Sequence, residues 1–132
     1  MKADVQFLSV QDVLYLHDRA IAFAGGAREV RDVAALEGAV EAPKATFDGK
    51  YLYSNLEEMA AAYWHGLSQN HPFVDGNKRA GLYAADAFLA ANGLDLVLNE
   101  IEAEKMALKM AAGKVSREQL TSFIRKHVRP LS

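Results

Sequence analysis

Apolar residues recur at spacings of three and four along most of the chain, in blocks that end at glycine or proline. This periodicity is typical of amphipathic helices whose apolar face packs against a core. It predicts six helices: one from Ser9 to the Gly25-Gly26 pair, one from Asp32 to Pro43, and four over Leu56–Gln69, Asn77–Asn92, Asn99–Ala112 and Ser116–His127. No internal repeat, linker or low-complexity segment divides them, so we expect one domain over residues 1–132.

Several of these helices begin with a good cap residue that is followed, three residues later, by an acidic or amide side chain. Such a pair satisfies two backbone N–H groups that have no partner at the start of a helix. The pairs are Ser9 with Asp12, Ser54 with Glu57, Asn99 with Glu102, and Ser116 with Gln119. They predict where four of the helices begin.

Two of the predicted helices are apolar enough to form the centre of the domain. Their inward-facing residues are Met59, Ala60, Tyr63, Trp64 and Leu67 on the first, and Ala80, Ala84, Ala87 and Ala91 on the second. Small side chains at this spacing let neighbouring helices approach closely. We therefore expect an all-α fold, a compact bundle of about six helices. Between Ala45 and Tyr53, before the central helices, the pattern favours a short flap or hairpin.

Composition limits the classes of function that the chain can have. Hydrophobic residues make up 51% of the 132, which is enough for a real core. A formal net charge of −2 gives no general attraction to nucleic acid or to an anionic membrane. The absence of cysteine excludes disulfides, thiolate metal sites and a cysteine nucleophile. With no signal-peptide pattern and no apolar run near the roughly 20 residues of a membrane span, we expect a cytoplasmic protein that binds neither membrane nor nucleic acid directly.

The short link between the two central helices is crowded with polar and ionisable residues. It reads His71-Pro72-Phe73-Val74-Asp75-Gly76-Asn77-Lys78-Arg79. Gly76 and Asn77 open a helix, where free backbone N–H groups bind anions. Lys78 and Arg79 add positive charge at this helix start, which is unfavourable unless an anion is bound there. These features indicate a phosphate site.

The remaining residues of the link suit the chemistry of a nucleotide. Asp75 supplies a hard oxygen ligand for Mg²⁺ beside phosphate oxygens. The imidazole of His71 can take a proton from an attacking hydroxyl, while Pro72 restricts its backbone. Phe73, apolar between polar neighbours, is expected to anchor the link in the core.

Each of these residues also has an ordinary structural explanation. A histidine before a helix is most often exposed or structural, Asp75 favours a helix N-terminus, and Asn77 can serve as an N-cap. Lys78 and Arg79 can form a solvated face. These explanations account for single residues but not for three kinds of ionisable group within one short link, and this crowding favours a functional site.

The link resembles the signature of the Fic/Doc family, which reads His-Pro-Phe-x-(Asp/Glu)-Gly-Asn-(Gly/Lys)-Arg-x-x-Arg. Every chemical position is filled in register except the last Arg, where this chain has Leu82. Outside the link, the segments similar to Doc-type (death on curing) members are Leu16-His17-Asp18, Gly25-Gly26, Arg31-Asp32 with Leu36, Pro43, and Ala112 to Ser116. The resemblance covers most of the chain and implies the Fic/Doc fold.

Lys78 and Leu82 distinguish this chain from most Fic enzymes that transfer AMP, which carry Gly and a second Arg there. Doc-type members share both differences, and the resemblance implies that ATP binds in the opposite sense and gives up its γ-phosphate. It further implies a general base, His71, an Mg²⁺ ligand, Asp75, and a triphosphate cradle formed by Gly76, Asn77, Lys78 and Arg79. Losing an Arg removes a bidentate phosphate clamp and gaining a Lys adds a point charge, so the physical reading also favours a re-seated triphosphate.

The same resemblance implies partners. It implies a toxin that phosphorylates a threonine of elongation factor Tu, inhibits translation, and is neutralised by a C-terminal helix of a small Phd-like antitoxin. The self-inhibitory motif of many Fic proteins, Ser/Thr-x-x-x-Glu-(Gly/Asn), is absent: Ser54 and Glu58 have its spacing, but Met59 follows. Restraint by a separate protein is therefore expected.

Two alternatives stay open from the sequence. One is a Fic-type transferase that attaches AMP or another nucleotide to a protein hydroxyl. The other is an inactive Fic-fold protein that only binds a partner or a nucleotide. A weaker candidate for binding is the connection before the central helices, where Phe47, Tyr51 and Tyr53 form either a flap that takes up a target segment as an extra strand or a plain surface loop.

Overall fold

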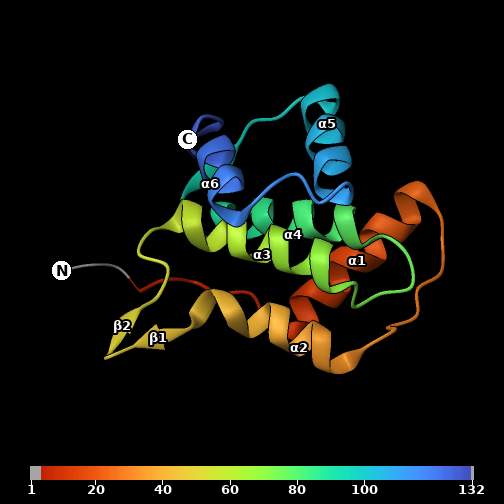
Figure 1. Ribbon diagram of the computed structural model, residues 1–132, viewed down its shortest axis with the longest axis horizontal. Helices are drawn as coiled ribbons and strands as arrows, with labels where there is room; N and C mark the ends of the chain where they lie inside the picture. The colour runs from red at the N-terminus through yellow and green to blue at the C-terminus, as the bar shows by residue number, and fades with distance from the viewer. Residues whose placement is uncertain (1–3, 132) are drawn as a thin grey trace.

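The computed structural model describes residues 4–131. Its α-helices are α1 (Val10–Ala24), α2 (Val33–Glu41), α3 (Leu56–Asn70), α4 (Asn77–Ala91), α5 (Glu100–Ala111) and α6 (Arg117–Arg125) (Figure 1). A 3₁₀ turn, Ala42–Lys44, extends α2. Two antiparallel pairs of short strands join β1 (Thr46–Phe47) to β2 (Lys50–Tyr51), and β3 (Leu94–Leu96) to β4 (Val128–Pro130). The expected all-α bundle and the hairpin before the central helices are confirmed, whereas the pairing of β3 with β4 was not foreseen.

Helices α3 and α4 run side by side through the middle of the molecule, and the other helices surround them (Figure 1). In this view α5 and α6 lie on one side of the pair and α2 lies on the other. The face predicted for α3 is buried, and Ala61, Ala62 and Ser68 are buried as well, so α3 is enclosed nearly all round. On α4, Ala84 is fully buried, whereas Ala91 ends the helix and is exposed. No helix within residues 4–131 combines the length and the apolar character that a bilayer crossing needs.

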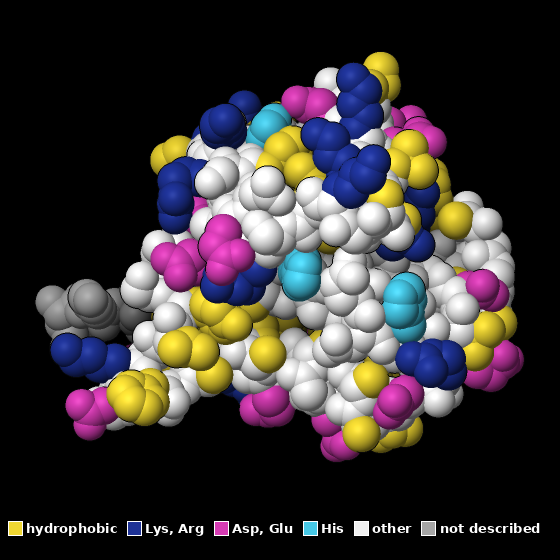
Figure 2. Space-filling model, in the orientation of Figure 1, with side chains coloured by type: hydrophobic (Ala, Val, Ile, Leu, Met, Phe, Trp, Pro, Cys, Tyr) yellow, Lys and Arg dark blue, Asp and Glu magenta, His cyan; other side chains and the backbone are white. Residues whose placement is uncertain are grey.

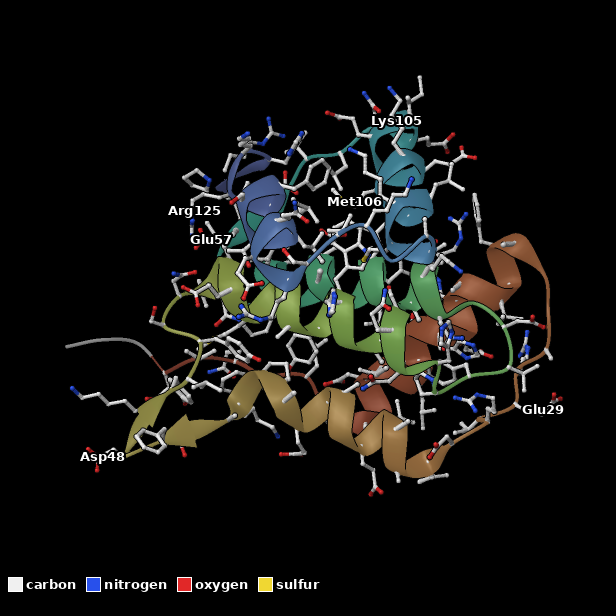
Figure 3. The ribbon with its side chains drawn as sticks, in the orientation of Figure 1. Glu29, Asp48, Glu57, Lys105, Met106 and Arg125 are labelled. Carbon is white, nitrogen blue, oxygen red and sulfur yellow. The ribbon has the colours of Figure 1, made fainter. Side chains whose placement is uncertain are left out.

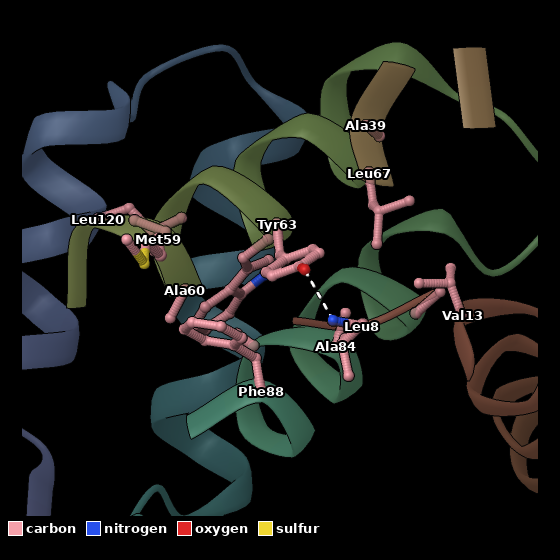
Figure 4. Close-up of a cluster of buried hydrophobic side chains, with 14 of the residues drawn as sticks. Leu8, Val13, Ala39, Met59, Ala60, Tyr63, Leu67, Ala84, Phe88 and Leu120 are labelled. Atoms are coloured by element: carbon pink, nitrogen blue, oxygen red, sulfur yellow. Dashed lines mark hydrogen bonds between the residues drawn. The ribbon is translucent and has the colours of Figure 1, made fainter. Parts of the chain in front are cut away.

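The core is one cluster of apolar side chains between these layers, part of which is drawn in Figure 4. Tyr63 of α3 and Phe88 of α4 pack ring against ring, with 5.2 Å between centroids. The Tyr63 hydroxyl accepts a hydrogen bond of 2.9 Å from the backbone N–H of Leu8, which fastens the segment before α1 to the core (Figure 4). Burial raises the pKa of Tyr63 to about 12, so the side chain stays a neutral phenol at physiological pH.

Helices α3 and α4 approach one another very closely at Gly81. A Cβ atom at this position would lie 2.8 Å from the carbonyl oxygen of Trp64 and 3.0 Å from Ser68 Oγ. These distances are shorter than non-bonded atoms tolerate, so the helix contact itself requires glycine. This approach fixes the separation that the loop between the two helices has to span.

Three of the four predicted cap pairs form as expected. They are Ser9 with Asp12, Asn99 with Glu102, and Ser116 with Gln119, and each exchanges two hydrogen bonds between side chain and backbone. The prediction for α3 was wrong by one residue, because Asn55 rather than Ser54 is the N-cap. Asn55 accepts a hydrogen bond from the backbone N–H of Glu58 (2.9 Å), and its amide also donates to the Glu58 carboxylate (2.7 Å). Ser54 Oγ also donates to this carboxylate (3.3 Å), so the bond to the backbone N–H is what makes Asn55 the cap.

The β1–β2 hairpin precedes α3 and lies beside its N-terminal end (Figure 1). The polar link follows the C-terminal end of α3, which has 15 residues, and a helix of that length is about 22 Å long. Phe47 is 79% exposed, Tyr51 packs on Phe7, and Tyr53 lies under the guanidinium of Arg117. The hairpin therefore lies at the opposite end of α3 from the polar link, and the uptake of a target segment by this hairpin stays a prediction.

Replacing Gly81 by Ala should destabilise the protein by about 1–3 kcal/mol, because α3 and α4 must move apart to admit a methyl group. The measurement is the free energy of unfolding in urea. Gly38→Ala in α2 is a matched control, since a Cβ there meets nothing within 4 Å, and it should stabilise by about 0.5–1 kcal/mol through helix propensity. Similar effects of the two substitutions would contradict the close contact at Gly81.

Candidate functional site

The loop between α3 and α4 carries the polar cluster and turns the chain with two left-handed residues. His71 caps the end of α3 with φ 49° and ψ 55°, and Gly76 precedes α4 with φ 82°. Histidine is among the side chains that enter this region more readily than most. A Cβ at Gly76 would also lie 3.1 Å from Ile21 Cδ1 and 3.4 Å from His17 Nε2. Both the backbone angle and the contact with α1 therefore favour glycine at position 76.

Two buried side chains hold the loop while the side chain of His71 stays exposed. Phe73 is 1% exposed and stacks on the imidazole of His17, with 3.6 Å between ring centroids and 6° between ring planes. The predicted anchor is therefore confirmed. Asn77 Oδ1 accepts a hydrogen bond from Phe73 N–H, and Asn77 Nδ2 donates to Phe73 O, both at 2.9 Å. The loop thus has a fixed shape that leaves the His71 side chain exposed.

Helix α4 begins without a side-chain cap, unlike the other five α-helices in residues 4–131. The N–H groups of its first turn have no acceptor within the helix. The Asn77 side chain is engaged with Phe73, so Gly76 and Asn77 would reach an anion through their backbone rather than through a side chain. An uncapped helix start of this kind is a ready anion site.

Asp75 is held through both its backbone and its side chain. His17 Nε2 donates to Asp75 O (2.7 Å), and Ala27 N–H donates to Asp75 Oδ2 (2.7 Å). The second carboxylate oxygen, Oδ1, bonds to no other residue in the described range. Because this range has no group of three or more His, Asp or Glu side chains that could hold a metal ion, Mg²⁺ at Asp75 would take its other ligands from water and phosphate, which is its usual coordination.

Lys78 and Arg79, half-buried in the first turn of α4, line a groove of about 680 Å³ between α4 and α5. The Arg79 guanidinium lies 4.6 Å from the centre of the Phe23 ring, which holds it against α1. The apolar walls of the groove come from Leu82, Leu96, Leu98, Ala103 and Ala107. His71 and Asp75 are not part of this lining. The start of α4 therefore adjoins two regions, the loop that carries His71 and the groove.

The groove also has acidic side chains, which sequence reasoning missed. Asp86 lies two turns beyond Lys78 on α4, and Glu100 and Glu104 belong to the α5 wall. Burial raises the pKa of Asp86, and the negative charge of Asp95 raises it further. No ion pair within residues 4–131 involves Asp86. The available signal was its spacing of eight residues from Lys78, because residues four apart share a helix face.

One wall of the groove, α5, is tied to the end of α6 by His127. Its Nδ1 donates to Phe123 O (2.7 Å), and its Nε2 donates to Glu102 Oε2 (2.9 Å). The Phe123 carbonyl raises the pKa of His127, and Glu102 adds to this. The Asn99 N–H lowers the pKa of Glu102, and His127 adds to that.

Lys and Arg side chains gather around α5 and α6 (Figure 2), so the small negative net charge is unevenly distributed.

The sequence of the loop and of the helices beside it matches a known protein family. The model of the Fic/DOC family matches residues 7–89, which include α1, the loop and most of α4. "Toxin Doc" of Mycolicibacterium smegmatis is 44% identical over 91 residues, covering 69% of this chain and 68% of that protein. "Protein kinase doc" of Escherichia phage P1 is 26% identical over 122 residues, covering 92% of this chain and 95% of that protein.

The pair of His127 and Glu102 should make stability depend on pH. A raised pKa means that the folded protein binds the His127 proton more tightly, so this contribution is present below pH about 6.5 and is lost as pH rises through the folded pKa. The lowered pKa of Glu102 has the opposite consequence, and its contribution is lost as the pH falls through that pKa.

The free energy of unfolding, measured in urea from pH 5 to 8, should show this dependence. The free energy of unfolding of the wild type should exceed that of His127→Gln most near pH 5 to 6, and this difference should shrink toward pH 8. Glu102→Gln should remove part of the same pH dependence, because it replaces the negatively charged acceptor of the imidazolium with a neutral amide while the Phe123 carbonyl remains. Parallel curves for the wild type and His127→Gln would contradict the tie between α5 and α6.

Proposed function

The chain belongs to the Fic/DOC family as a Doc-type member, and on that premise we propose that it transfers the γ-phosphate of ATP to a hydroxyl of a target protein, with Mg²⁺ as cofactor. The observation that carries the proposal is the uncapped start of α4 beside an exposed histidine. The phosphates would bind to the free N–H groups of this helix start and to Lys78 and Arg79. His71 would accept the proton of the target hydroxyl.

In the proposed reaction the target hydroxyl oxygen attacks the γ-phosphorus. The bond from that phosphorus to the β–γ bridging oxygen breaks, ADP leaves, and the imidazole of His71 takes the hydroxyl proton. The N–H groups of the first turn of α4, with Lys78 and Arg79, stabilise the negative charge on the phosphates. Mg²⁺ at Asp75 would neutralise part of that charge. Positioning and charge stabilisation supply most of the catalysis in reactions of this kind.

Two residues and one relative support transfer of phosphate rather than AMP. Leu82 lines the groove as an apolar side chain, at the position where AMP-transferring Fic enzymes carry a second Arg that clamps phosphate. Lys78 places an extra point charge at the start of the helix. The phage P1 relative bears the name "Protein kinase doc".

We further propose that the groove receives a helix of a small Phd-like antitoxin and that elongation factor Tu is the target. One relative is named "Toxin Doc", which fits a chain held in check by a partner. The groove joins apolar walls to both basic and acidic side chains, which suits an amphipathic helix. An occupant in contact with Lys78 and Arg79 would deprive ATP of these charges. The choice of elongation factor Tu rests on the family resemblance alone.

Incubation of the protein and elongation factor Tu with labelled ATP and Mg²⁺ tests the reaction. Label in the γ position should appear on the factor, and label in the α position should not, because the β–γ bond is the one that breaks. Transfer of α-label instead would replace the proposal with AMP transfer. A lysate of bacterial proteins treated in the same way shows whether the target is a different protein.

His71→Asn should lower the rate of transfer by at least about 100-fold, because an amide cannot take the proton. Asn is chosen because it also tolerates the left-handed backbone at this position. The control is His65→Asn on α3, which lies outside the loop and the groove and should keep full activity. Thermal unfolding of both variants checks that the fold is intact. Unchanged transfer by His71→Asn would exclude His71 as the base.

Ala107→Arg on the α5 wall should weaken antitoxin binding by about tenfold or more, because it places an unpaired charge against the apolar face of the partner. Cells that express this variant together with the proposed Phd-like antitoxin should stop growing, whereas cells that express the wild-type protein with the same antitoxin should grow. Ala111→Arg is the control, since Ala111 is exposed on α5 and does not line the groove. Equal neutralisation of both variants would show that the antitoxin binds elsewhere.

A further inference from the structure

The segment between α1 and α2 runs alongside the loop that carries His71. Arg31 N–H and Asp32 N–H donate to Pro72 O at 2.7 and 3.1 Å, and Val74 N–H donates to Glu29 O at 3.1 Å. Val30 and Phe73 form an antiparallel bridge between these bonds. Figure 3 shows Glu29 on this segment, beside the loop between α3 and α4. The loop is therefore supported along its length by a piece of chain about 40 residues earlier.

The side chain of Arg31 adds a second kind of contact. Its Nε donates to His71 O (2.7 Å), and its Nη2 donates to Asn70 O (3.1 Å). These are carbonyls at the C-terminal end of α3, which have no N–H partner within the helix and attract positive charge. Arg31 thus bonds to the backbone of His71, the residue whose side chain is proposed to take the proton. The φ angle of His71 is 49°.

We propose that Arg31 is a positioning residue that sets the direction of the His71 side chain. This inference rests on the proposed role of His71. Two bonds from one planar guanidinium fix the orientation of two successive peptide groups, and the direction of the Cα–Cβ bond of His71 follows from these groups. A displacement of about 1 Å at a reacting group can lower a rate by about 100-fold.

The contacts separate positioning from overall stability. The backbone pairing of residues 29–32 with the loop uses main-chain atoms, so it persists when the Arg31 side chain is removed. Phe73 and Asn77 also keep their buried contacts. Loss of the guanidinium should therefore free the peptide of His71 without unfolding the loop. Lysine in its place carries the charge but lacks the planar fork, so it can orient only one of the two carbonyls.

Steady-state kinetics of phosphate transfer test the proposal in the full-length protein. Arg31→Ala should lower kcat by about 10- to 100-fold and leave the KM for ATP within about twofold, because no contact of Arg31 involves the start of α4. Arg31→Lys should fall between Arg31→Ala and the wild type. Methylguanidinium at millimolar concentration should restore part of the kcat of Arg31→Ala, since position 31 is exposed, and should not raise its melting temperature.

The matched control is Arg28→Ala, in the same segment. The Arg28 side chain forms an exposed ion pair with Asp18 (2.8 Å) and no hydrogen bond with the loop, so its removal should leave kcat unchanged. Unchanged kcat in Arg31→Ala would overturn the proposal. A lower kcat that is accompanied by a lower melting temperature, and that methylguanidinium does not restore, would show that Arg31 is a purely structural residue. That result would overturn the proposal as well.

A measurement without activity separates this inference from the proposed function. In ¹H–¹⁵N spectra, the amide signals of His71 and Phe73 should shift or broaden in Arg31→Ala, while those of α5 and α6 stay in place. Unperturbed signals would overturn the inference even if the wild type transfers phosphate. If the signals are perturbed in Arg31→Ala but the wild type transfers no phosphate, the proposed function is refuted and the hold of Arg31 on the His71 backbone stays supported.

Discussion

The close contact between α3 and α4 at Gly81 constrains both the core and the site. Between the ends of these two helices, only residues 71–76 reverse the chain. A turn this short uses left-handed backbone at both ends, and the chain takes it at His71 and Gly76. The turn then directs the uncapped start of α4 toward the side chains of the loop. The packing of the core therefore helps to place the uncapped start of α4, where we propose that phosphate binds.

Most of the fold was predictable because its determinants are local. Helical periodicity and cap pairs depend on residues within one or two turns, and they located five helix starts, including the Asp32 cap of α2. The start of α3 was misplaced because Ser54 and Asn55 are adjacent cap residues, and only the hydrogen bond that Asn55 accepts from the backbone N–H of Glu58 distinguishes them. The pairing of Leu94–Leu96 with Val128–Pro130 was missed because three-residue strands have no periodicity of their own and gain order only from a distant partner.

The candidate site divides in the same way. The crowding of ionisable residues in one link was visible in the sequence, and the structure confirms that Phe73 anchors it. What supports the link was not visible, since His17, Ala27 and Arg31 contact it across 40 to 58 positions of the chain. The use of the Asn77 side chain was also missed, because a bond to a residue four positions earlier depends on the shape of the loop. The sequence therefore indicates which side chains are candidates for the chemistry, and tertiary contacts determine the orientation of these side chains.

Lys78 and Arg79 belong both to the start of α4 and to the lining of the groove. A partner helix in the groove and a triphosphate at the helix start, as proposed, would draw on the same two charges. Since coupling between two ligands is reciprocal, ATP would weaken the partner by the factor by which the partner weakens ATP. The acidic residues Asp86, Glu100 and Glu104 lie on other parts of the lining and would contact the partner alone. Because α5 buries only Met106 and Met110, its wall can change to select a partner with little cost to the core or to the phosphate site.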